Sequence, residues 1–159
     1  MVVRVAPWRE DARYAEDGIK GARPVALLLS AAAQLPDGRV VPVSEGSVLP
    51  PEAVVLLRYE AQAAGQALLV TQAQGVAPRA LGSFTLAPGG HDLTDADGEL
   101  AGVSLEGERG PFTLALLAAV PGARLSESPE ALRAALEGTA GTARVAALHV
   151  EVRPGHTVP

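Results

Sequence analysis

Cysteine is absent from the 159-residue chain, and aromatic residues make up only 3% of it. The lack of cysteine excludes a disulfide framework, a thiolate metal site and a cysteine nucleophile. The scarcity of aromatic rings removes the stacking platforms on which single-stranded nucleic acids and many sugars bind. With 48% hydrophobic residues, the chain is expected to build its core from aliphatic side chains.

Lysine is also scarce: Lys20 is the only one, beside twelve arginines, and the formal net charge is -5 at pH 7. Such a chain offers little to attract phosphate backbones, so nucleic acid is not an expected partner. No run approaches the roughly 18 apolar residues of a membrane span, and residues 1–10 lack the apolar centre of a signal peptide. We therefore expect a soluble chain without an export signal.

Turn signals recur between apolar segments at the spacing typical of a β-sandwich. The expected strands are Pro24–Ala31, Arg39–Val43, Val54–Ala61, Gln66–Gln72, Ala80–Leu86, Glu99–Leu105, Pro111–Val120 and Arg144–Val152. Leu35 to Gly38 reads as a turn in which glycine can adopt a positive φ. Residues 62–65 form a short loop with glycine, which predicts that the strands on either side of it make a hairpin.

The side-chain patterns of these strands predict how they lie. Val55, Leu57 and Tyr59 share one face, while Arg58 and Glu60 share the other, as in a half-buried strand. In the strand beginning at Pro111 the residues of both faces are apolar, so we expect a central position for it. In the last strand, the apolar side is formed by Ala146, Leu148, Val150 and Val152.

One helix is expected at about residues 129–137. Ser128 can cap it, Pro129 suits its first position, and Gly138 can end it. Its narrow apolar stripe, formed by Leu132, Ala135 and Leu136, is expected to cover the open end of the sandwich. The sequence thus predicts a mainly β protein: an antiparallel β-sandwich of about seven to nine strands with one short C-terminal helix. The sandwich spans residues 20–153, after an irregular arm (1–19) and before a C-terminal tail (154–159).

The most site-like stretch is acidic, and its carboxylates are Asp92, Asp95, Asp97 and Glu99. Carboxylates clustered before a glycine can wrap a hard cation such as calcium. Aligned on a calcium loop, however, Leu93 and Ser104 fall at positions that require carboxylates. An exposed acidic turn is the alternative interpretation and the one we favour, so no metal is assigned.

Two further patterns suggest chemistry. Gly102 to Gly107 is close to a nucleophile elbow around Ser104, but its second glycine comes one residue late. His91, His149 and His156 are too widely spread in the sequence to define a base. His149 beside Glu151 on one strand face suggests a pH-sensitive contact, for which a solvated histidine is the alternative. We assign no catalytic residue and no cofactor.

Three stretches together resemble a known kind of domain: Asp17 to Pro24, Val55 to Ala61 and Leu105 to Leu114. In that order they resemble an uncharacterised β-rich domain of myxobacterial-type proteins, over roughly residues 17–138. That domain often follows the membrane helix of anti-sigma-factor-like proteins, so the resemblance implies an extracytoplasmic sensing or interaction module. The chain lacks the His/Cys zinc motif of the anti-sigma module, and no functional residue is carried over.

The sequence therefore predicts a non-catalytic protein-interaction or sensory accessory domain that binds protein partners. Its expected contact surface is an exposed edge strand or the acidic loop from Asp92 to Glu99, and a homo-oligomer formed by strand addition is one form of assembly. The alternative is a structural subunit of a cytoplasmic multi-protein assembly. A small hydrolase ranks third and requires a histidine and a carboxylate beside Ser83 or Ser104. The compartment depends on the true start: cytoplasmic if the chain begins at Met1, extracytoplasmic if a membrane anchor precedes it.

Overall fold

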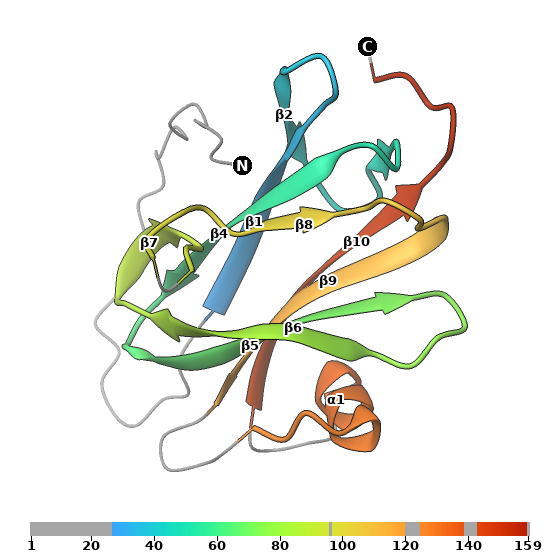
Figure 1. Ribbon diagram of the computed structural model, residues 1–159. Helices are drawn as coiled ribbons and strands as arrows, with labels where there is room; N and C mark the ends of the chain where they lie inside the picture. The colour runs from blue at the N-terminus through green and yellow to red at the C-terminus, as the bar shows by residue number, and fades with distance from the viewer. Residues whose placement is uncertain (1–26, 96, 120–124, 139–142, 159) are drawn as a thin grey trace.

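The computed structural model describes residues 27–95, 97–119, 125–138 and 143–158. These residues form two sheets that pack face to face, with one helix on the outside (Figure 1). The predicted Lys20 boundary and the arm before it lie outside the described residues. The mainly β class with one short helix is confirmed, and the arrangement is that of a β-sandwich.

Ten strands are present in the described part of the chain. The first sheet contains β1 (Leu27–Gln34), β2 (Val40–Val43), β4 (Val54–Ala61), β7 (Gly89–Asp92) and β8 (Gly102–Ser104). The second contains β3 (Val48–Leu49), β5 (Gly65–Ala73), β6 (Arg79–Leu86), β9 (Gly110–Ala119) and β10 (Ala143–Val152). The helix α1 spans Pro129–Leu136.

The strand orders define the edges of both sheets. The first sheet has the order β2-β1-β4-β7, and β8 continues the β7 edge by pairing with the other end of β4. The second sheet has the order β3-β10-β9-β5-β6. All pairs are antiparallel except β3 with β10. The edges among the described residues are therefore β2, the β7–β8 line, β3 and β6.

The alternation of the strand sequences fixes the core. Leu57 and Tyr59 of β4 point inward and pack against Leu114 and Leu116 of β9, all in one buried cluster. Arg58 and Glu60 turn outward and are only partly buried. β9 occupies the centre of its sheet, between β10 and β5, as its two apolar faces predict.

The helix covers the outer face of the second sheet. Leu132 and Ala135 of α1 pack against Leu68, Val70 and Leu117, whose side chains point away from the sandwich interior. The predicted apolar stripe is confirmed, and the Ser128 hydroxyl accepts a hydrogen bond from the Ala131 N–H. The expectation that α1 closes the end of the sandwich was wrong, because β5 and β9 carry apolar residues on both faces and their outer side needs a cover.

Two strand predictions were also wrong. β4 and β5 do not form a hairpin: β4 belongs to the first sheet and β5 to the second, so the turn after Ala61 carries the chain across the sandwich. The strand expected over Glu99–Leu105 is confined to β8, because Glu99 closes a turn with Asp95. β3 and β7 were not predicted, since they are short and β7 contains two glycines.

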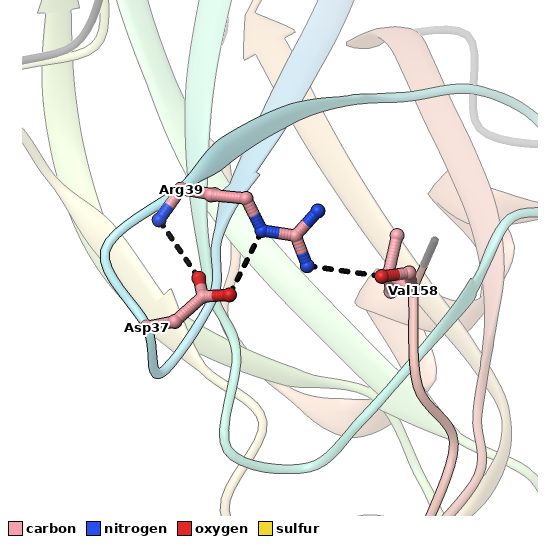
Figure 2. Close-up of polar contacts among 3 residues, drawn as sticks. All are labelled: Asp37, Arg39 and Val158. Carbon is pink, nitrogen blue, oxygen red and sulfur yellow. Dashed lines mark hydrogen bonds and ion pairs between the residues drawn. The ribbon is translucent and has the colours of Figure 1, made fainter.

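The turn after β1 and the C-terminal end of the described chain are joined by Arg39. Figure 2 shows its guanidinium between the Asp37 carboxylate, at 2.8 Å, and the Val158 carbonyl oxygen, at 2.9 Å. The backbone N–H of Arg39 also donates to Asp37, and this hydrogen bond is the main cause of the lowered pKa of that carboxyl group. Gly38 has a φ of 92°, as the turn prediction requires. The Val158 side chain packs against the core, so this part of the tail belongs to the sandwich.

Candidate functional site

The four acidic residues of the predicted loop do not converge. Asp92 lies in β7, where its carboxylate is 3.4 Å from Arg58 Nη1 on β4. Asp95 Oδ1 accepts the backbone N–H groups of Asp97 and Glu99, at 2.9 and 3.0 Å, and so shapes the turn. Among the residues that the structure describes, no group of three His, Asp or Glu side chains lies close enough to hold a metal ion.

The hydrolase candidates are also separated. Ser104 Oγ accepts a hydrogen bond from the Glu106 N–H at 3.2 Å, in the turn after β8. The ring of His91 lies 5.8 Å from that of Tyr59, and its Nε2 is 2.8 Å from the Pro88 carbonyl oxygen. Within the described ranges, no hydrogen bond joins a histidine to Ser83 or Ser104. A nucleophile and base pair of the kind that activates serine is not assembled in this part of the chain.

His149 has a carboxylate partner, but it is a different residue from the neighbouring Glu151. Glu45 lies in the turn between β2 and β3. Its carboxylate accepts a hydrogen bond from the backbone N–H of His149 at 3.1 Å and another from the Nδ1 atom of the His149 ring at 2.7 Å. Glu151 instead contacts Arg153 at 3.2 Å. The sequence carried no signal for Glu45, because it lies 104 residues from His149 and meets it only through the pairing of β3 with β10.

The Glu45 contact predicts a pH dependence. The hydrogen bond from the His149 backbone N–H is the main cause of the lowered pKa of Glu45, and the His149 side chain lowers it further. The contact therefore stabilises the fold above the unfolded-state pKa of Glu45 and is lost as the pH falls through the lower folded-state pKa. In a carbon-detected NMR titration, Glu45 should titrate at lower pH in the folded protein than in urea; equal midpoints would contradict this.

Three of the four described edges are poor templates for another strand. β2 has only four residues and contains Pro42, and β3 has only two. β7 and β8 are also short, and the turn around Asp95 separates them. Short strands and proline are devices by which proteins prevent edge-to-edge pairing.

β6 differs from the other edges. It has eight residues without proline or lysine, and its side chains are exposed at alternate positions. An exposed leucine, Leu81, lies within it with 44% of its surface accessible. A long edge without these protections can pair with the backbone of another chain.

The register shows which backbone groups β6 offers. The N–H of Gln74, directly after β5, donates to the carbonyl oxygen of Pro111 in β9. The backbone N–H and C=O groups of the even-numbered residues of β5 therefore point to β9, and those of the odd-numbered residues point to β6. Ala67 is opposite Phe84 and Gly65 is opposite Leu86, so these β6 residues bond to β5. The N–H and C=O groups of Ser83 and Thr85 therefore point to the open side.

The open part of β6 is limited at both ends. The pairing with β5 shifts at Leu69 and Val70, which leaves Leu81 as an extra residue, a β-bulge. At the other end, the Ala87 N–H donates to the Tyr59 hydroxyl at 2.9 Å, and Pro88 has no N–H to offer. The free edge is therefore the five-residue stretch Gly82–Leu86, which we call the β6 edge.

A second open stretch lies on β10. The N–H and C=O groups of His149 point toward β3, and those of Val145 and Ala147 point the same way. The two-residue strand β3 does not extend far enough to pair with Val145 and Ala147. They have no hydrogen-bond partner among the described residues. Cα atoms of β1 come within 8 Å of β10, however, and the stretch begins directly after residues 139–142, which are not described. For the β6 edge, in contrast to the open stretch of β10, the structure describes the residues on both sides.

Comparison of the chain with family models, with curated proteins and with solved structures found no match in any of the three. In the described residues, no helix has the length and apolar character needed to cross a membrane. The functional interpretation therefore depends on the geometry of the chain itself, and the β6 edge is its best-defined candidate.

Proposed function

We propose that this chain is a non-catalytic protein-interaction domain of an accessory or regulatory kind, and that it binds by adding a strand of its partner to the β6 edge. The observation that carries the proposal is the contrast among the edges: three are short or contain proline, whereas β6 has eight residues without proline and offers the uncharged stretch Gly82–Leu86 after its bulge. In strand addition the main-chain hydrogen bonds supply affinity, and alternate side chains supply specificity.

The surroundings of the β6 edge support this mode of binding. The Ser83 and Thr85 side chains are exposed on the outer face, where Gln66 of β5 donates to the Thr85 hydroxyl at 3.1 Å. Phe84 packs against the core from the inner face and holds the strand in place. The α1 helix covers the same sheet nearer to Ala80 and leaves Ser83 and Thr85 uncovered. A rigid strand with free backbone groups is a preorganised binding surface.

Thr85→Lys tests the proposal. A lysine on the β6 edge introduces the charge that natural edge strands use against pairing, and we expect partner binding to fall by about tenfold or more. Val76→Lys is the matched control, because Val76 lies in the turn between β5 and β6 and is 57% exposed. It adds the same charge outside the β6 edge.

The measurement is photo-crosslinking of the full chain in its native host, with benzoylphenylalanine at position 81, followed by mass spectrometry. Amine crosslinkers are unsuitable, since the chain has a single lysine, Lys20. We expect one partner to be captured by the otherwise unchanged chain and by Val76→Lys, but not by Thr85→Lys. Equal capture by Thr85→Lys and Val76→Lys would overturn the proposal. Separate analysis of membrane and soluble fractions assigns the compartment.

A further inference from the structure

We propose that the partner at the β6 edge is a second copy of this chain, so that two antiparallel β6 strands join the second sheets of both copies across a two-fold axis at Phe84. This inference rests on the proposed function and adds to it the identity of the partner and the pairing register. The argument begins with the length of the free edge.

The β6 edge is centred on Phe84. It begins after the bulge at Leu81 and ends before Ala87, whose N–H is already bonded to Tyr59. An antiparallel copy centred on Phe84 places Ser83 of each chain opposite Thr85 of the other. Every outward N–H and C=O of these two residues then has a partner, and neither copy must change its backbone. Other registers leave some of these groups unpaired.

The side chains are compatible with this register on both faces. On the outer face, Ser83 lies opposite Thr85, a hydroxyl pair that is favourable between strands. On the inner face, Phe84 lies opposite its own copy at a position of close approach, where aromatic pairs are favourable. Gly82 lies opposite Leu86 of the other copy and brings no side chain to this pair. A Cβ atom at position 82 would lie 3.4 Å from the Phe84 ring of the same chain.

Charge also favours a second copy at this site. The chain carries a net charge of -5, so two copies repel each other overall and contact is favoured where the surface carries no charge. The five residues of the β6 edge carry no charge, and like charges would not face each other across the axis. Two-fold pairing of identical patches is the commonest form of protein assembly. The product is one continuous sheet in which the β6 edge is no longer free.

The test is the oligomeric state of the purified full chain, measured by analytical ultracentrifugation over a range of concentrations. We expect a reversible dimer. Thr85→Lys should raise its dissociation constant by about tenfold or more, because two lysines then lie close to the axis, whereas Val76→Lys should leave it unchanged. Ser83→Pro removes an outward N–H that makes no bond within the described fold and should also give a monomer with an unchanged circular dichroism spectrum.

A wild-type chain that is monomeric at every concentration would overturn the dimer, and so would a dimer that persists in both Thr85→Lys and Ser83→Pro. These results differ from failure of the proposed function. A monomeric chain that still captures another protein through position 81, and loses it in Thr85→Lys, retains the interaction function and refutes only the second copy as partner.

Discussion

Leu116→Ala should lower the free energy of unfolding by about 2–5 kcal/mol, the range observed when a large buried aliphatic side chain is truncated. Leu116 has no exposed surface and lies on the inner face of β9, the central strand of the second sheet. Its neighbours in the sheet are Leu69 of β5 and Ala146 of β10. A cavity here weakens the packing between the two sheets, because the rigid strands on both sides limit how far the space can collapse.

The measurement is urea denaturation followed by circular dichroism, and Val76→Ala is the control. Val76 is 57% exposed in a turn, so its truncation should change the free energy of unfolding by less than about 0.5 kcal/mol. If Leu116→Ala had as small an effect as Val76→Ala, the assignment of β9 to the centre of the core would be wrong. The comparison is made at low protein concentration, where dissociation of a dimer does not contribute to the transition.

The central strand was predictable from the sequence because its signal is local. Alternation of side chains in a strand has a period of two, and apart from Thr113 both faces of the segment from Phe112 to Ala119 are apolar. A strand with two apolar faces must be covered on both sides. The structure provides this with the first sheet on one side and α1 on the other.

The connection between β4 and β5 could not be predicted from the local sequence. A short loop with glycine fits both a hairpin and a turn that crosses between sheets, and the alternation of the flanking strands is the same in both. What decides is tertiary packing: β4 pairs with β1, and β5 pairs with β9. These partners are distant in the sequence, so sequence periodicity alone could not reveal the crossing.

The sequence led us to expect a type of contact surface, but it did not say which strand would form it. An exposed edge strand or the acidic loop from Asp92 to Glu99 was expected as a contact surface, but the edge could not be assigned without the strand order of both sheets. β6 is an edge because it is the last strand in the described order of its sheet, with β5 on one side only. Its outward backbone groups follow from the register, and its limits follow from the bulge at Leu81 and the Tyr59 contact with Ala87. The acidic loop, by contrast, was visible in the sequence, but its carboxylates form turn and strand contacts separately.

Gly102→Ala should destabilise the fold by about 1–3 kcal/mol, the usual cost of adding atoms to a closely packed site. A Cβ at Gly102 would lie 2.7 Å from Val54 Cγ1 and 3.4 Å from Leu56 Cδ2. The Val54 side chain is β-branched and has little freedom to rotate away, so the strain would pass to the pairing of β8 with β4.

A double-mutant cycle isolates this contact. Val54→Ala removes the methyl group that an alanine at position 102 would meet, so the pair Gly102→Ala and Val54→Ala should be more stable than the sum of the single changes predicts. The measurement is urea denaturation of all four proteins. If the two effects simply add, the cost of Gly102→Ala comes from elsewhere, and the close approach of β8 to β4 is not its cause. A clear rescue would show that the close approach of β8 to β4 at Val54 is what requires glycine at position 102.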